Sequence, residues 1–310
     1  MKKNKIAPWL VFFRLPNLPT APGDAIAGAA IALSLTQVFD ASSTVPLQLI
    51  AAGAAALLFY MFGLADNDIV GAEEDKTHAP KRPIPSGGIT LAQAQIARAT
   101  CLILAVAGSA LCHMPVAWWY ASVVLVVVIL FYNRLKSKWP MFGLLAMGLC
   151  RGLSLFTGAA AMQDVALGTL FSPAVLLAVA GWTAYIGAVS WLASKEHEAR
   201  DPMPGYRFLP GLTVFVPMAA LALYPPRLWT IISVCSLCAY GIWLLSVLPL
   251  GRPHTPEIRR RSVGNAIGAI LYLQAAYILA FPHVVLVSIV IAIFTCNVII
   301  RKFFGNVQGS

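Results

Sequence analysis

The sequence predicts an all-helical membrane protein, a bundle of nine or ten spans, and three observations support this. Hydrophobic residues make up 59% of the 310 residues and charged residues only 11%, whereas soluble domains contain about 25% charged residues. The mean hydropathy is +0.78, and several apolar runs reach the roughly 20 residues that a helix needs to cross a bilayer. The basic residues fall in alternate loops between these runs, as expected of a multi-pass protein.

The apolar runs define ten candidate spans in chain order, at residues 23–39, 47–65, 92–112, 116–133, 141–162, 172–194, 208–224, 228–249, 263–280 and 284–300. Only Phe281, Pro282 and His283 separate the last two runs, which therefore form either two spans or one kinked, partly re-entrant element. The spans use nearly the whole chain. We therefore expect a single domain over residues 1–310, with no sizeable soluble part.

The formal charge of +10 follows the predicted topology. Of the 22 Lys and Arg residues, 19 lie in the N-terminal segment, in loops 66–91, 134–140, 195–207 and 250–262, and in the C-terminal segment. The positive-inside rule then places both termini and these loops in the cytosol, in a bacterial-style inner (cytoplasmic) membrane. The charge is thus explained by the lipid bilayer as partner, and no nucleic-acid motif is found. The first apolar run lacks a small-residue cleavage pattern, so no signal peptide is predicted.

The segment from Ala65 to Thr90 carries five of the 12 carboxylates in the chain. If it continues the second span as a helix, Asp68 and Asp75 lie seven residues apart on one face, and Asn67 adds an amide oxygen beside them. Oxygen ligands of this kind suit Mg²⁺, which usually bridges one or two carboxylates to a phosphate. By composition alone, a solvated loop with mixed charges is an equally valid interpretation.

The order of residues in this loop resembles the first signature of the UbiA superfamily of membrane prenyltransferases. That signature reads N-D-x-x-D-x-x-x-D and is often followed by R-P-x-P-S-G. The matching residues here are Asn67, Asp68, Asp75, Arg82, Pro83, Pro85, Ser86 and Gly87. Gly71 stands where the signature has its middle Asp.

Two further segments resemble the same superfamily. Tyr132 and Lys136 fit its Y-x-x-x-K element after the fourth span, and the segment from Arg14 to Asn17 is similar to its opening R-x-x-N-type segment. Together with the carboxylate loop, these motifs cover the first half of the chain.

The resemblance implies a helical bundle around a central cavity and an intramembrane enzyme, a transferase of alkyl groups other than methyl. Such an enzyme binds an isoprenyl diphosphate through Mg²⁺ at its cytosolic side and transfers the prenyl group to a lipophilic or aromatic acceptor. The implied metal ligands are Asn67, Asp68 and Asp75, and the implied catalytic residues are Asp68, Asp75 and Tyr132. With this implication, the expected substrate-binding residues are Asn17, Asn67, Arg82, Lys136 and Glu196, joined by Lys81 from its place just after the carboxylates and by Arg151 from its place inside a span.

The second half departs from the superfamily pattern. Glu196, Glu198 and Asp201 follow the sixth span, but not at the spacing of the second Asp-rich signature. This loop either ligates a second Mg²⁺ or only contacts substrate. A non-catalytic UbiA-like lipid-binding or carrier protein is therefore the alternative, and a transporter is a further one. A transporter would need a polar pathway, yet almost no charged residue lies near the predicted outer face.

Charged residues inside the predicted spans need partners or a cavity. Arg151 lies near the middle of a span, where it either faces a cavity and contacts diphosphate or a polar acceptor, or pairs internally. Asp24 begins the first span, where a carboxylate favours a helix N-terminus. Arg98 lies near the cytosolic end of its span, and snorkelling accounts for it.

Overall fold

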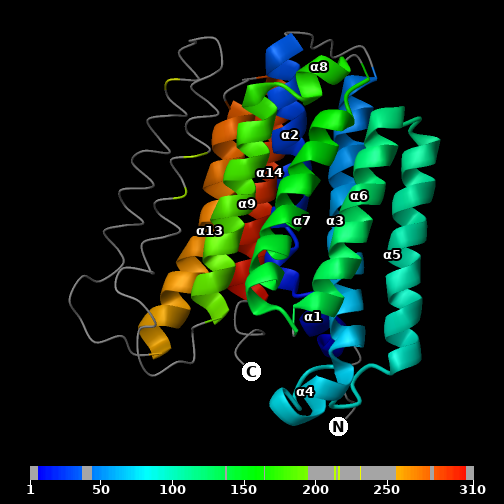
Figure 1. The fold of residues 1–310 in the computed structure, drawn as a ribbon, viewed down its shortest axis with the longest axis vertical. Coiled ribbons are helices and arrows are strands. Elements are labelled where there is room, and N and C mark those ends of the chain that lie inside the picture. The colour runs from blue at the N-terminus through cyan, green and yellow to red at the C-terminus, as the bar shows by residue number, and fades with distance from the viewer. Residues whose placement is uncertain are drawn as a thin grey trace.

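The computed structural model describes residues 6–36, 44–136, 138–163, 165–194, 256–279 and 283–304, and the single positions 213, 216 and 231. Over these residues all regular structure is helical, and six helices are long and apolar enough to cross a membrane (Figure 1). The predicted all-helical membrane fold is thereby confirmed. The predicted spans 208–224 and 228–249 lie outside the described residues, apart from three isolated positions, so the count of nine or ten stays a prediction.

The described helices follow the predicted spans closely. They are α1 (Ala7–Phe12), the 3₁₀ turn η1 (Leu15–Asn17), α2 (Thr20–Thr36), α3 (Val45–Val70), α4 (Ala72–His78), α5 (Leu91–Leu111), α6 (Val116–Leu135), α7 (Pro140–Ala160), α8 (Leu167–Leu170), α9 (Pro173–Ser194), α13 (Pro256–Leu279) and α14 (Val284–Phe304). The last pair consists of two separate helices. The start of α5 is fixed locally, because the Thr90 hydroxyl accepts from the Gln93 backbone N–H and the Gln93 side chain accepts from the Thr90 N–H.

Helix α2 lies at the centre of the bundle, and α5 lies at its edge (Figure 1). Most residues of α2 are buried, since it packs against α3, α7 and α13. The outer face of α5 instead exposes large apolar side chains, among them Ile96, Ile103 and Leu104. Apolar side chains on an outer face suit contact with lipid tails, so this pattern agrees with a bundle embedded in a bilayer.

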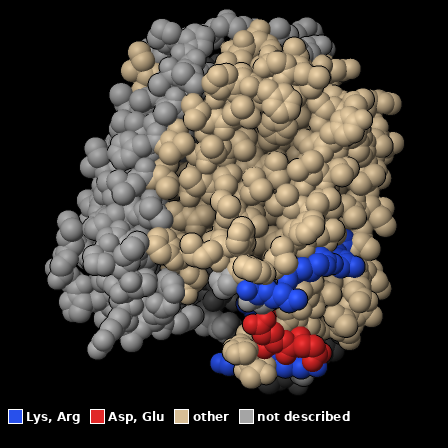
Figure 2. Space-filling view, viewed as in Figure 1, with Lys and Arg blue, Asp and Glu red and all other residues tan. Residues whose placement is uncertain are grey.

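Charged side chains gather at one end of the bundle. Figure 2 shows that on the visible face the Lys, Arg, Asp and Glu side chains of the described residues lie around α4, while the rest of that described surface carries none. We call this the α4 end. The break between α3 and α4 is slight, since the Gly71 N–H donates to the Asn67 carbonyl and the Asp75 N–H donates to the Gly71 carbonyl. The helix therefore carries its carboxylates past the end of the apolar span.

Helices α2 and α7 approach closely through two glycines. A Cβ added at Gly158 would overlap the carbonyl oxygen of Ala25, and one added at Gly28 would overlap the carbonyl oxygen of Leu155. In each case the obstacle is backbone, which cannot swing aside. Small residues that let backbones touch are the usual basis of helix packing inside membranes.

Gly158→Ala should therefore destabilise the bundle, at the upper end of the about 1–3 kcal/mol that overpacking costs. Thermal unfolding in detergent measures the effect. Gly108→Ala is the matched control, because Gly108 is also inside a helix and a Cβ there would meet nothing within 4 Å. An equal unfolding temperature for the two variants would contradict the close crossing.

Candidate functional site

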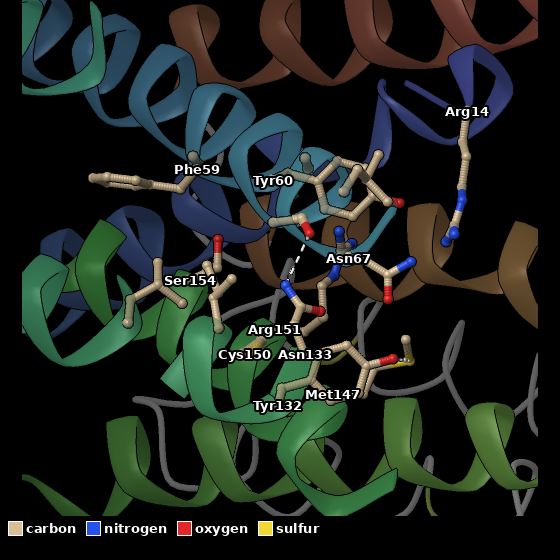
Figure 3. Close-up of a pocket in the computed structure, with 16 residues that line it drawn as sticks. Arg14, Phe59, Tyr60, Asn67, Tyr132, Asn133, Met147, Cys150, Arg151 and Ser154 are labelled. Carbon is tan, nitrogen blue, oxygen red and sulfur yellow. Dashed lines mark hydrogen bonds between the residues drawn. The ribbon is translucent and has the colours of Figure 1, made fainter. Parts of the chain in front are cut away.

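A cavity of about 660 Å³, a volume that includes its open mouth, lies between α2, α3, α6 and α7 (Figure 3). Its wall is mostly apolar. Arg14 and Asn67 place polar side chains near the α4 end, and Arg151 places one further along α7. The lining residues are Arg14, Ala21, Ala56, Phe59, Tyr60, Gly63, Leu64, Asn67, Leu125, Ile129, Tyr132, Asn133, Met147, Cys150, Arg151 and Ser154.

The mouth of the cavity carries a cluster of opposite charges. Asn67 Nδ2 donates to Asp68 Oδ1 over 3.1 Å, and the Asn67 amide oxygen accepts a hydrogen bond from Lys136 Nζ. Arg14 Nη2 lies 3.7 Å from Asp68 Oδ1. The last turn of α3, the end of α6 and the turn after α1 thus bring two cations and one carboxylate together around an amide.

Asp75 extends this cluster along the same side of the helix. Its side chain is mostly buried and accepts from Arg82 Nη1 over 2.6 Å. A Cβ at Gly71 would lie 3.6 Å from Asp75 Oδ2, so position 71 faces the same carboxylate. The missing middle Asp of the signature would therefore have stood next to Asp75.

Lys136 lies just beyond the end of α6, and its surroundings disfavour its charge. Burial lowers the pKa of Lys136 below its ordinary value, and the positive charges of Arg14 and Arg82 lower it further. The carboxylates of Asp68 and Asp75 oppose this effect only in part. An anion bound at the mouth would stabilise the ammonium form, so the cluster is electrostatically suited to an anionic ligand.

The oxygen donors at the mouth fit Mg²⁺ held jointly with a ligand. Over the described residues no group of three or more Asp, Glu, His and Cys side chains is placed to hold a metal. Asp68, Asp75 and Asn67 supply two carboxylates and one amide oxygen. Mg²⁺ typically takes one or two carboxylates, completing its shell with water and phosphate oxygens. A diphosphate would provide those remaining oxygens.

Tyr132 stands one turn below Lys136 on α6, on the cavity side. Lys136 Nζ lies 5.9 Å from the centre of the Tyr132 ring, and the Tyr132 hydroxyl lies 3.9 Å from the sulfur of Met147. Figure 3 shows Tyr132 and Met147 side by side among the residues that line the cavity, which also include Asn67. The charged mouth thus passes within one helical turn into an aromatic and apolar wall.

Arg151 lines the cavity and also forms a buried ion pair. Its Nε lies 2.7 Å from Asp24 Oδ2, and its Nη2 donates to Asp24 Oδ1 and to the Thr20 carbonyl, each over 3.1 Å. Asp24 Oδ1 also accepts from Trp182 Nε1 and Gln274 Nε2. The helix-terminus interpretation of Asp24 is therefore wrong, since this carboxylate is fully buried and joins α2 to α7, α9 and α13.

A second buried carboxylate, Asp66, was missed by the sequence reasoning. It is fully buried, and its oxygens lie 2.8 Å from Arg98 Nη1 and 3.4 Å from Arg134 Nη1. Asn133 Nδ2 donates to it over 2.9 Å. Arg98 therefore pairs inside the protein rather than snorkelling. The sequence feature that could have identified Asp66 as a separate site is its spacing from Asp68. Residues two apart on a helix point to different faces, so Asp66 does not share the face of Asp68.

The remaining predicted substrate residues lie elsewhere. Asn17 is half-buried in η1, where its carbonyl accepts a hydrogen bond from the Thr20 hydroxyl. It is not among the cavity-lining residues, whereas Arg14, three residues earlier, lines the cavity. Arg14 has φ of +47°, in the left-handed region. Lys81 is exposed on the loop after α4, and Glu196 lies outside the described residues.

Solved structures with the same fold cover most of the chain. A digeranylgeranylglyceryl phosphate synthase is 20% identical, with 89% of this chain and 99% of the other covered and a TM-score of 0.60. A UbiA homologue from Aeropyrum pernix K1, in its apo form, is 19% identical, with coverages of 82% and 96% and a TM-score of 0.63. One from Archaeoglobus fulgidus, bound to GPP and Mg²⁺, is 14% identical, with coverages of 87% and 99% and a TM-score of 0.57.

These likenesses show the fold. No curated protein sequence matches the chain. The sequence model of the UbiA prenyltransferase family, however, matches residues 25–262, well over half of the chain. This multi-pass membrane protein therefore belongs to the UbiA prenyltransferase family.

Proposed function

We propose that this protein is a Mg²⁺-dependent prenyltransferase, which moves an isoprenyl group from its diphosphate to a lipophilic or aromatic acceptor within the membrane. One observation carries the proposal. Carboxylates and cations, Asp68 and Asp75 with Arg14 and Lys136, stand at the mouth of an apolar cavity. This arrangement suits a molecule with a charged head and an apolar tail.

The charged mouth would bind the diphosphate. Asn67, Asp68 and Asp75 would hold Mg²⁺, and Arg14, Arg82 and Lys136 would neutralise the phosphate oxygens. The bound metal supplies charge stabilisation for the diphosphate as it leaves. Cations placed where negative charge develops act most strongly in a site from which water is excluded. Lys81 and Asn17 stay candidates for the outer part of this site, as Glu196 does from the second loop.

The apolar wall would hold the prenyl chain and keep water from the reacting carbon. Phe59, Leu125 and Ile129 lie along the cavity, and Tyr132 lies nearest the charged mouth. Water excluded from the site cannot capture a reactive allylic centre. Homologues from Archaeoglobus fulgidus bound to GPP or DMAPP with Mg²⁺ support a donor of this class. The basic loops support an active site on the cytosolic side of the inner membrane, with both termini in the cytosol.

Gly71 in place of the signature's middle Asp, and the altered spacing of the acidic residues in the second loop, are the features that favour a non-catalytic carrier. The purified protein in nanodiscs should bind geranyl diphosphate tightly with Mg²⁺ and at least about tenfold more weakly after chelation, as expected when a divalent cation bridges protein and phosphate. Diphosphate release on addition of a membrane lipid extract then reports transfer. Binding of equal strength with and without Mg²⁺, and no release of diphosphate, would favour the carrier.

A further inference from the structure

Met147 places a thioether sulfur in the cavity wall beside Tyr132, and it is not among the predicted site residues. Its sulfur lies 3.9 Å from the Tyr132 hydroxyl, and Ser190 Oγ on α9 donates a hydrogen bond to the same sulfur over 2.8 Å. Both Met147 and Tyr132 line the cavity (Figure 3). The sulfur is thus held by one hydroxyl and touched by a second.

The depth of Met147 matches the expected position of the reacting carbon. Lys136 contacts Asn67 at the mouth, and Tyr132 stands one turn, about 5.4 Å, further in on α6. In an isoprenyl diphosphate, C1 is bonded directly to the diphosphate oxygen. A diphosphate at the mouth therefore brings C1 to the level of Tyr132 and Met147.

A thioether at this level has two opposite consequences. Its polarizable lone pairs stabilise positive charge, as in sulfur contacts with the edges of aromatic rings. A free lone pair is also a nucleophile that can capture an allylic cation. In that capture, an S–C bond forms to C1, the C1–O bond breaks, and the diphosphate leaves with the bonding electrons. The product is a prenyl sulfonium at Met147, with one positive charge on sulfur.

We propose that Met147 stabilises the developing allylic cation and that Ser190 is a positioning residue that prevents alkylation of the Met147 sulfur. The Ser190 hydroxyl occupies one of the two lone pairs of the sulfur, and this hydrogen bond holds the sulfur at the wall, away from bonding distance of C1. Charge stabilisation then remains, while attack at C1 is suppressed. This inference rests on the proposed prenyltransferase function.

The first test is Met147→Leu, a swap of similar volume that replaces the thioether by an aliphatic side chain. With geranyl diphosphate and Mg²⁺, we expect diphosphate release to slow about five- to tenfold, the scale of a sulfur–π contact, with donor affinity unchanged. Met141→Leu is the matched control, because Met141 lies exposed on the same helix, α7. Equal rates in the two variants would overturn the role of Met147.

The second test is Ser190→Ala, read by mass spectrometry of the intact chain and its peptides after turnover. We expect progressive inactivation and about tenfold more geranyl adduct at Met147 than in the wild type, the scale of one hydrogen bond. Ser190→Thr, which keeps the hydroxyl, should restore the wild-type adduct level, and the double variant Ser190→Ala/Met147→Leu should carry none. Ser194→Ala on the same helix is the control.

The outcomes separate this inference from the function beneath it. Wild-type protein that releases diphosphate, with a Ser190→Ala variant that gains no adduct, overturns the protective role of Ser190 alone. Wild-type protein that releases no diphosphate under any condition overturns the prenyltransferase proposal, and the inference with it. Geranyl adduct that appears only when the Ser190 hydroxyl is removed supports both the protective role of Ser190 and the prenyltransferase proposal.

Discussion

Asp68→Asn should lower prenyl transfer by about 10²–10³-fold, the typical effect of removing one electrostatic group from a reacting centre. The side chain keeps its shape and can still accept from Asn67 Nδ2, so the fold should be unchanged. What disappears is the negative charge that would hold Mg²⁺ against the diphosphate. Asp75→Asn should behave alike, since Asp75 lies in the same cluster. The measurement is transfer of a radiolabelled prenyl group in membranes.

The same substitutions should have an opposite effect on binding without metal. Arg14 and Lys136 would face one carboxylate fewer, so the mouth would become more positive. After chelation of Mg²⁺, each variant should therefore bind geranyl diphosphate more tightly than the wild type does. Glu73→Gln is the matched control, because Glu73 lies on the same helix as Asp75 but is exposed, and among the described residues its ion pair is with Lys76. Wild-type transfer in Asp68→Asn or Asp75→Asn would contradict the assignment of the site.

Asp24→Ala should destabilise the protein by about 3–5 kcal/mol, because it leaves the Arg151 guanidinium buried without a counter-charge. Two further groups lose an acceptor, since Trp182 Nε1 and Gln274 Nε2 also donate to Asp24 Oδ1. The loss of stability is measured by thermal or denaturant unfolding in detergent.

The double variant Asp24→Ala/Arg151→Met shows whether the charge is the cause. Removing both members of a buried ion pair usually costs far less than removing one, because no uncompensated charge remains. We therefore expect the double variant to recover much of the lost stability. A double variant as unstable as Asp24→Ala would indicate that the hydrogen bonds to Trp182 and Gln274, and not the ion pair, dominate.

The positions of the helices were predictable because they depend on local properties of the chain. Apolar runs of sufficient length gave the bounds of α3, α5 and α6 to within a few residues, and the cap of α5 is a threonine, a residue type that favours this position. The shared face of Asp68 and Asp75 followed from helical periodicity, since Gly71 interrupts the helix only slightly. All these features rest on residues close together in the chain.

The assembly of the site was predictable only in part. The resemblance to family motifs assigned Asn67 and Lys136 separately to the metal and the diphosphate, and the structure places the two side chains in contact. Arg14 at the cavity mouth, in place of Asn17, depends on a left-handed turn after α1 that the sequence did not signal. The roles of the motif residues in binding metal and substrate stay predictions.

The sequence by itself determined that this is a helical membrane protein with a carboxylate face at the end of α3. Hydrophobicity and helical periodicity depend on residues within a few turns of one another along the chain. Only the tertiary structure decided which side chains from distant parts of the chain meet. Asp24 pairs with Arg151, 127 residues away, and Ser190 reaches Met147, 43 residues away. Such partners depend on how closely helices cross, and at α2 and α7 that is decided by the backbone contacts of Gly28 and Gly158.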